Sequence, residues 1–586
     1  MPNNGDETIV TGLKYLSSPA LGGLNPDVIG IGNFHKTLPH NEFGEVDPAA
    51  YAAFVTASTT GGDYESIPRG PVGTGYVVPT PAVGDKFNNP QAARAHDKLT
   101  GPATDYQMPP APRVRSLSTA AEMTELQWMA LLRDLPFINF ATEPRVTKAI
   151  ADISSHFSAA LAANEPGGLQ LGTDLPRNLQ NRLDLRLETL FRCGLLGEDK
   201  GPIISQFFLH DIAYGAQFIQ QTVRPYAKGL NFLTDYDSWI RAQNAGLDKW
   251  ADGYADDNNF MKEPSLEDAT GVRHLSSMRD VSRFVNKDAL HQAYFNAALL
   301  CLNWGVPFDA GNPYATYQRQ GRFGTFGGPD LLTRVSEVAG RALAVVWHQK
   351  WEVHRRLRPE AYGGLMQMQA IGYPPGPGGT KRAYGLPDAA FTSEAAKALN
   401  SLSGNYFLPM AFTAGSPPHP AYGAGHATVA GACVTVLKAW LAEKTPLKKL
   451  LKDHDVRNPY RPVPPDTGVV VISQADAAGK LAPYTGADVD EMTVEGELNK
   501  IACNVAMGRS MGGVHWRSDN TRSLRLGEQL AVELLRSESQ DYAERRLPGN
   551  TAPIWTFTSF NGNAVTIYDG KVLVNSSPFD PKSGPL

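Results

Sequence analysis

The chain has 586 residues, of which 54 are lysine or arginine and 59 are aspartate or glutamate, giving a formal net charge of −5. This near balance gives no reason to expect nucleic acid or an acidic membrane as a partner, so any cationic site has to be local. At this length we expect roughly two to four domains, or one large helical domain with appendages.

The cysteines lie far apart, so we expect neither a disulfide framework nor a zinc site. The first residues lack the basic start and apolar run of a secretory leader, and no stretch is long and apolar enough to span a bilayer. We therefore expect a soluble protein, in the cytoplasm or in a compartment that the sequence leaves unknown. The four cysteines are Cys193, Cys301, Cys433 and Cys503.

Residues 1–112 are rich in glycine, proline and asparagine, which predicts an extended, loop-rich N-terminal arm. A polar segment of this length would be disordered on its own. Because this arm carries aromatic residues, we expect it to pack on its own body or on a neighbouring subunit. These aromatic residues include Phe34, Tyr51, Phe54 and Tyr76.

Residues 113–548 have apolar residues at helical spacing, which predicts a mainly helical region. Its first helix is expected to begin with a capping box formed by Thr119 and Glu122 and to end at Pro136. A second helical block is expected over residues 280–304.

The longest helix is expected to begin at Gly328, where Asp330 can act as its cap, and to be stopped by Pro359. A short strand is predicted over residues 469–472. Helices are expected to resume near Glu495 and after Asp519. Residues 549–586 alternate around two turn signals, Asn561-Gly562 and Asp569-Gly570, and predict a small C-terminal β-hairpin.

A loop with three prolines and three glycines runs from Ala414 to His426 and ends where a helical pattern begins. The first N–H groups of a helix have no partner within it, so such a junction is a ready anion site. His419 and His426 flank this junction, and histidine exchanges protons readily near neutral pH. On this stretch alone, a loop with two surface histidines is an equally good interpretation.

Two further stretches gather cations and histidines. Lys350 to Arg358 holds four cations near the end of the longest predicted helix, where cations are also common for purely structural reasons. Arg509 to His515 predicts a helix end at which two glycines present a histidine, which more often is structural than a ligand. Together the cations, the histidines and the helix start form a set suited to a tetrahedral oxyanion.

In order and spacing, the stretches Lys350–Pro359, Ala424–His426 and Arg509–His515 resemble the three-part signature of vanadium-dependent haloperoxidases and the related acid phosphatases. The residues around them, such as Trp351–Glu360 and His419–Tyr422, resemble the red-algal and cyanobacterial bromoperoxidase branch. The resemblance implies a mainly α fold with two four-helix-bundle-like cores. With the patterns above, it gives three regions: the arm over 1–112, a helical catalytic region over 113–548, and a hairpin and tail over 549–586.

The resemblance also implies residue roles. His515 would coordinate vanadium through a ring nitrogen. The equatorial oxygens of vanadate would be held by Lys350, Arg358, Arg509 and the backbone N–H of Gly425.

The remaining roles concern the reagents. By resemblance, His426 would be the acid–base residue beside the apical oxygen, and Asp288 would pair with it. His419 would line the approach of halide and peroxide, while Lys350 would make peroxide more electrophilic. Trp347, one helical turn before Lys350, matches a tryptophan of some members where red-algal enzymes have arginine.

The chain departs from the family at Ala424, where most members have serine. Alanine cannot donate a hydroxyl hydrogen bond to an equatorial oxygen, and the loss of one such bond costs on the order of 1 kcal/mol. We therefore expect weaker vanadate binding or slower turnover than in relatives, unless water or a neighbouring group takes over.

The function implied by the resemblance is the oxidation of bromide and iodide by hydrogen peroxide to hypohalous acid, which halogenates small organic substrates. Because the chloride-using fungal relatives carry phenylalanine at the position of His419, we expect poor chloride oxidation. The implied cofactor is vanadate, and the class also admits a structural calcium ion, for which no ligand loop stands out. The red-algal relatives imply a homo-oligomer built on dimers, up to a dodecamer.

Two other functions stay open. A phosphomonoesterase would use the same oxyanion cage, with His515 as the nucleophile. A non-catalytic oxyanion-binding or assembly protein would explain the long arm and the alanine at position 424. The length, the arm and His419 favour the peroxidase.

Overall fold

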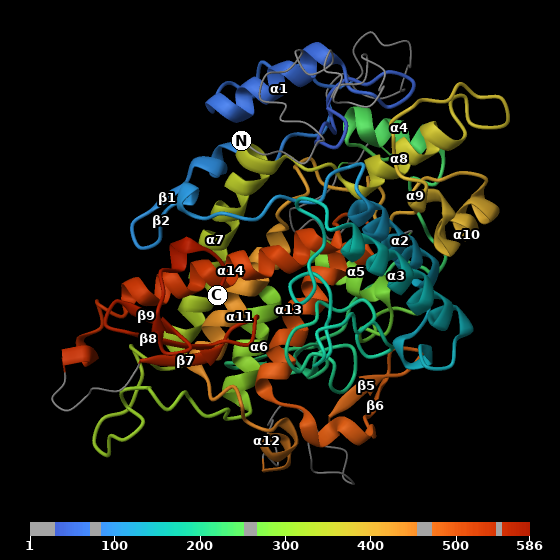
Figure 1. The fold of residues 1–586 in the computed structure, drawn as a ribbon. Coiled ribbons are helices and arrows are strands. Elements are labelled where there is room, and N and C mark those ends of the chain that lie inside the picture. The colour runs from blue at the N-terminus through green and yellow to red at the C-terminus, as the bar shows by residue number, and fades with distance from the viewer. Residues whose placement is uncertain (1–29, 71–83, 251–252, 254–265, 454–471, 547–553) are drawn as a thin grey trace.

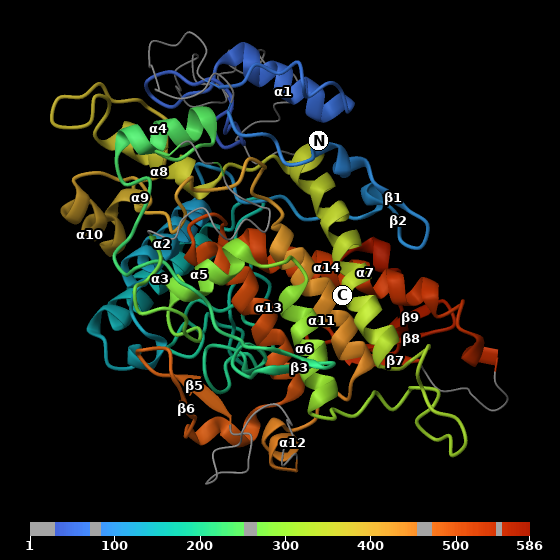
Figure 2. The ribbon, with the colours of Figure 1, turned by 180° about the vertical axis from the view of Figure 1, so that it is seen from behind.

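The structure, a computed structural model, describes residues 30–70, 84–250, 253, 266–453, 472–546 and 554–586. It confirms the predicted mainly α fold: helices fill the middle of the molecule, and short strands lie at its edges (Figures 1 and 2). Within these ranges, no helix combines the length and the apolar character that a membrane crossing needs. All four cysteines are buried and free.

The central element is α11 (Gly425–Trp440), which lies among α7 (Gly328–His348), α13 (Val494–Met511) and α14 (Arg517–Glu538) (Figure 1). A further helix, α6 (Gln292–Asn303), packs on α7. Every residue of α13 is buried, and His426 is the one residue of α11 that is not fully buried. Three long helices, α7, α13 and α14, therefore enclose α11.

A second helical group forms around α2 (Leu117–Leu132), which packs against α3 (Pro144–Ala163), α9 (Ala389–Thr392) and α10 (Glu394–Ser403). The helices thus gather in two groups, although α9 is a single turn. The capping box expected for α2 is wrong. The helix begins at Leu117, so Thr119 lies inside it and Ser116 is the cap, accepting the N–H of Thr119 at 3.1 Å. Glu122 instead forms a buried ion pair with Arg356.

The block expected over 280–304 is two helices, α5 (Met278–Lys287) and α6, separated by residues 288–291, of which Asp288 is extended. The helix α7 also differs from its prediction. Its cap is Gly327, while the Asp330 carboxylate accepts the N–H of Phe326 at 2.9 Å. At 21 residues it is slightly shorter than α14, which has 22.

A π-helical segment, Gln349–His354, continues α7, and Arg355 then ends it in the left-handed region at φ 50°. Pro359 does not stop this helix, as we had expected, but begins the next one, α8 (Pro359–Ala370). Proline suits the first position of a helix because the N–H it lacks would have no partner there.

The N-terminal arm packs on its own chain. Phe34, Tyr51 and Phe54 are buried in a cluster around Trp351, and Tyr51 and Phe54 belong to α1 (Pro48–Thr60), a helix that the sequence did not predict. Phe34 and Trp351 meet edge to face with ring centroids 5.9 Å apart. Tyr76 lies outside the described residues.

The C-terminal hairpin is in fact a four-stranded antiparallel sheet of order β10-β9-β8-β7. Its strands are β7 (Trp555–Thr558), β8 (Ala564–Tyr568), β9 (Lys571–Val574) and β10 (Ser577–Pro578). Both predicted turns form, with Gly562 and Gly570 at φ 84° and 74°, conformations that glycine adopts without a steric penalty.

Shorter elements complete the fold. Most of the strand expected over 469–472 lies outside the described residues, and the first strand after it pairs in a small hairpin. The helices expected near Glu495 and Asp519 are α13 and α14. The remaining elements are α4 (Tyr236–Ala245), α12 (Leu447–Asp453), β1 (His96–Asp97), β2 (Gly101–Pro102), β3 (Ile212–Tyr214), β4 (Gln217–Ile219), β5 (Ser473–Ala475) and β6 (Leu481–Pro483).

Candidate active site

The three stretches singled out in the sequence meet beside the start of α11. Lys350 comes from the π-helical segment and Arg358 from the residue before α8. Arg509 comes from the end of α13, His515 from the turn before α14, and His419 from the loop before α11. All five residues are only 0–6% exposed. Cations are rarely buried to this extent. The five residues are Lys350, Arg358, Arg509, His419 and His515.

Lys350 lies on the π-helical segment and ties the glycine- and proline-rich loop to it. Its Nζ donates to the carbonyl oxygens of Pro420 and Ala421 at 2.8 and 3.2 Å and lies 5.6 Å from the ring of Trp347. A π-turn changes the direction in which side chains leave a helix, and such turns are frequent at functional sites.

Arg358 lies between His419 and His515 and donates to both. Its guanidinium donates to His419 Nδ1 at 2.9 Å, to His515 Nε2 at 3.0 Å and to the carbonyl oxygen of Val514 at 2.7 Å. An arginine can only donate hydrogen bonds, so His515 Nε2 carries a lone pair. The same holds for His419 Nδ1, since its contact with the carbonyl oxygen of Pro420, at 3.3 Å, is longer than that with Arg358. The tautomers follow from this network of hydrogen bonds.

His515 is held in one tautomer by Asp519. Its Nδ1 lies 3.0 Å from Asp519 Oδ2 and donates its proton there, so that Nε2 is free of a proton and can act as a metal ligand. Burial, with the positive charges of Arg358, Lys350 and Arg509, holds the pKa of His515 well below its usual value. The imidazole therefore stays neutral, which coordination to a metal requires.

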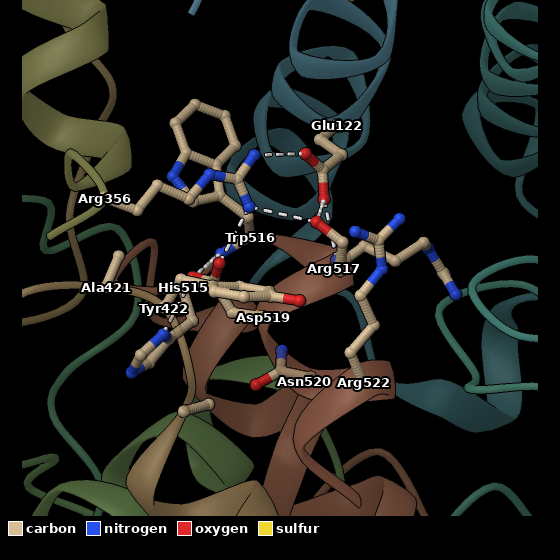
Figure 3. A network of polar contacts seen from close by, with 12 residues as sticks. Glu122, Arg356, Ala421, Tyr422, His515, Trp516, Arg517, Asp519, Asn520 and Arg522 are labelled. Atoms are coloured by element: carbon tan, nitrogen blue, oxygen red, sulfur yellow. Dashed lines mark hydrogen bonds and ion pairs between the residues drawn. The ribbon is translucent and has the colours of Figure 1, made fainter. Parts of the chain in front are cut away.

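Asp519 is fixed in turn by a buried network (Figure 3). Arg356 donates to Asp519 Oδ1 at 2.7 Å and to Glu122 Oε2 at 2.7 Å, and Glu122 also accepts the backbone N–H of Ser518 at 2.7 Å. The sequence reasoning missed Asp519 and Glu122 as site residues. The spacing of His515 and Asp519, four residues apart across a predicted helix start, was a usable signal for the first of them.

His426 points to the junction of α5 and α6. Its Nε2 lies 3.0 Å from Asp288 Oδ1, so the structure brings the expected pair together. Burial lowers the pKa of His426, Asp288 raises it in part, and the charges of Arg509 and Lys350 lower it further. Arg509 also reaches this junction, because it donates to the carbonyl oxygen of Val285 at 2.7 Å.

His419 and Trp347 face each other with ring centroids 4.9 Å apart. The indole N–H of Trp347 donates to the carbonyl oxygen of Asn88 at 3.0 Å, so the N-terminal arm helps to fix this side of the site. Burial and the nearby Lys350 and Arg358 hold the pKa of His419 well below its usual value.

The start of α11 is unusual in its capping. Ala424 occupies the cap position and has no side-chain acceptor for the first N–H groups of the helix, and its own N–H donates to Ser523 Oγ at 2.8 Å. Gly425 is the first helical residue. A side chain there would approach the ring of Trp347 to 3.3 Å, so glycine keeps this backbone accessible beside α7.

This donor set fits vanadate. Lys350, Arg358 and Arg509 are buried, and the positive charges of all three act on His515. An anion with several oxygens can accept charge-assisted hydrogen bonds from such a group of cations. The His515 lone pair supplies a nitrogen ligand. No group of three or more His, Cys, Asp or Glu side chains in the described part of the chain is arranged to hold a metal ion, and calcium stays a prediction.

Comparisons with known proteins identify the family. A family model described as the second helical-bundle domain of VCPO matches residues 334–544. The chain is 33% and 32% identical to the vanadium-dependent bromoperoxidases of Corallina pilulifera and Corallina officinalis, over 89% of this chain and 89% of each relative. A homohexameric structure of the second vanadate-dependent bromoperoxidase of Ascophyllum nodosum shares 26% identity and a TM-score of 0.75, over 95% of this chain and 87% of that one. The chain therefore belongs to the family of vanadium-dependent bromoperoxidases.

Proposed function

We propose that the protein is a vanadate-dependent haloperoxidase that oxidises bromide and iodide with hydrogen peroxide and so halogenates organic molecules. The observation that carries this proposal is the buried set of three cations around a neutral imidazole at the start of α11. In this proposal His515 Nε2 binds vanadium, while Lys350, Arg358, Arg509 and the N–H of Gly425 hold the oxyanion.

The chain's own groups would divide the remaining work. Bound vanadate supplies a Lewis acid that keeps one oxidation state. With Nε2 bound to Asp288, His426 has its lone pair on Nδ1, and this atom would accept the proton of an incoming peroxide. His419 accepts a hydrogen bond from Arg358 through Nδ1, so in the neutral ring the proton is on Nε2. This Nε2–H group could donate to a halide.

Halogenation of a cyclic diketone tests this proposal. We expect vanadate-loaded protein to be active with bromide and iodide and weakly active with chloride, and metal-free protein to be inactive. Strong activity with chloride alone would contradict the halide assignment. The relatives that match nine-tenths of the chain are bromoperoxidases by name, which favours this function over a phosphomonoesterase. Hydrolysis of 4-nitrophenyl phosphate without any halogenation would reverse that preference.

We also propose that the protein is a homo-oligomer. The support is that the solved Ascophyllum relative is a homohexamer. A dimer and a dodecamer stay predictions for this chain, and native mass spectrometry would count the subunits. A monomer would contradict the proposal.

A further inference from the structure

A cavity of about 430 Å³ borders the candidate active site at Asp288. Its walls come from Phe208, residues 219–224, the loop 267–275, the end of α5 and the first turns of α6. Among the described residues, Asp288 is the one active-site residue assigned above that also lines this cavity. The end of α5 is shared as well, because Arg509 donates to Val285 within it.

Asp288 has one carboxylate oxygen engaged with the active site and one that is not. Oδ1 accepts from His426 at 3.0 Å, and the side chain is only 3% exposed. Within the described part of the chain, Oδ2 accepts no hydrogen bond. A buried acceptor without a donor is unfavourable, so a hydroxyl group that enters the cavity would be stabilised here.

The walls of the cavity combine aromatic and aliphatic groups with an excess of positive charge. Phe208 and Phe284 meet edge to face with ring centroids 4.9 Å apart. Three cations face two carboxylates, and one of these cations, Arg224, is largely exposed at the solvent side, 3.5 Å from Glu267. Volume and lining are typical of sites for small organic molecules, which span roughly 300–1,000 Å³. The charged residues of the lining are Arg224, Arg283, Lys287, Glu267 and Asp288.

We propose that this cavity binds the organic acceptor of the halogenation, a small phenol-class aromatic with an anionic substituent. The ring packs against Phe208 and Phe284, the anionic group lies near Arg224, and the phenol hydroxyl donates to Asp288 Oδ2. A carboxylate at the hydroxyl makes the ring richer in electrons and hence a better target for an electrophile. The bound acceptor thereby contacts Asp288, which in turn contacts His426 of the candidate active site.

This inference rests on the proposed function, which supplies hypobromous acid. In the transfer, a ring carbon forms a bond to bromine while the oxygen–bromine bond of hypobromous acid breaks. The proton displaced from the ring and the released hydroxide form water. No further oxidant is needed, because hydrogen peroxide has already oxidised the bromide.

A competition experiment tests the site. 4-Hydroxybenzoate carries the ring, the hydroxyl and the charge, whereas 4-hydroxybenzyl alcohol lacks the charge. The two are brominated together, by the vanadate-loaded enzyme and by reagent hypobromite, and the ratio of brominated products is compared. We expect the ratio of brominated 4-hydroxybenzoate to brominated 4-hydroxybenzyl alcohol to be several-fold higher with the enzyme than with reagent hypobromite. The ratio is internal to each reaction and does not depend on turnover.

Two variants and two matched controls locate the effect. Arg224→Glu reverses the charge at the cavity, and Val272→Trp fills it from a half-exposed position. Both are expected to return the product ratio to that of the reagent. Arg182→Glu and Leu402→Trp make the same changes at exposed positions outside the cavity and are expected to keep the wild-type ratio.

A binding titration separates this inference from the proposed function. Saturation-transfer NMR with 4-hydroxybenzoate on vanadate-free protein is expected to show binding in the wild type and its loss in Val272→Trp. Triiodide formation from iodide needs no organic acceptor and reports the halide chemistry alone. Wild-type protein that forms triiodide but gives the reagent's product ratio would overturn the inference. Absence of triiodide would overturn the proposed function, and the titration would still decide whether the cavity binds the phenol.

Discussion

Replacing Asp519 by asparagine should release the tautomer of His515. In the wild type, Asp519 Oδ2 accepts from His515 Nδ1 and from the Trp516 N–H, both at 3.0 Å, while Oδ1 accepts from Arg356 at 2.7 Å. An amide has only one oxygen for these two directions. If the oxygen faces Arg356, the amide N–H₂ faces Nδ1 and favours the tautomer with the proton on Nε2.

The expected loss follows from this geometry. A proton on Nε2 removes the lone pair with which His515 would bind vanadium, and the opposite amide orientation sets two donors, the amide and Arg356, against each other in a buried site. Loss of such a supporting hydrogen bond typically lowers metal affinity about 10- to 100-fold, or about 1.4 to 2.7 kcal/mol. We expect a loss in this range for Asp519→Asn.

The assay is a titration of metal-free protein with vanadate, followed by the ⁵¹V NMR signal and by recovered bromination, with thermal unfolding as a check of the fold. Asp309→Asn is a suitable control. Asp309 is also poorly exposed, and it accepts from the Thr556 hydroxyl at 2.7 Å outside the candidate site. A folded Asp519→Asn protein that binds vanadate as tightly as the wild type would refute the reasoning.

Three further variants test other parts of the structure. His515→Ala should lose both bound vanadium and bromination, and a variant that keeps both would show that another residue is the ligand. Ala424→Ser should retain vanadate about fivefold more tightly, for about 1 kcal/mol from one added hydrogen bond; unchanged retention would mean that another group already fills this role. Burial raises the pKa of Glu528 to about 7, so the contribution of this group to stability falls as the pH rises from about 4.5 to 7. Glu528→Gln should remove that contribution, about 3 kcal/mol in urea unfolding, and an unchanged slope of stability against pH would contradict it.

The sequence predicted the places where local chemistry decides the structure. The start of α11 at Gly425 follows from a loop of prolines and glycines that gives way to a helical pattern. The turns at Gly562 and Gly570 follow from residue types that tolerate positive φ. The three cation- and histidine-containing stretches were recognisable for the same reason, since each carries its residues at short spacing.

Contacts between distant parts of the chain could not be predicted in this way. Helical periodicity alone accounts for the burial of one apolar face of α14, yet its polar side is buried as well. Arg517 pairs with Glu125 and Arg522 with Asp174, partners more than 300 positions away in the sequence. An interpretation from periodicity assumes that the charged face of a helix is exposed to water. The burial of this face becomes apparent only when its distant carboxylate partners are known.

The breaks in two helices have the same origin. No glycine or proline marks the end of α5, and Asp288 instead leaves the helix in a conformation that brings its carboxylate to His426. The π-turn at Lys350 likewise lies in a sequence that is compatible with an ordinary helix. There the carbonyl oxygens of Pro420 and Ala421 hold the lysine, so the turn depends on a loop 70 residues away.

The gathered cations tie cofactor binding to proton chemistry. The same charges that keep His515 neutral and able to ligate also lower the pKa of His426, which has to hold a proton at some stage of an acid–base cycle. Asp288 offsets this only in part, because burial and two cations act against it. An oxyanion in the cage would neutralise much of that positive field. We therefore expect His426 to gain basicity only when the site is loaded, so that the residue becomes an effective base at the time when peroxide can be used.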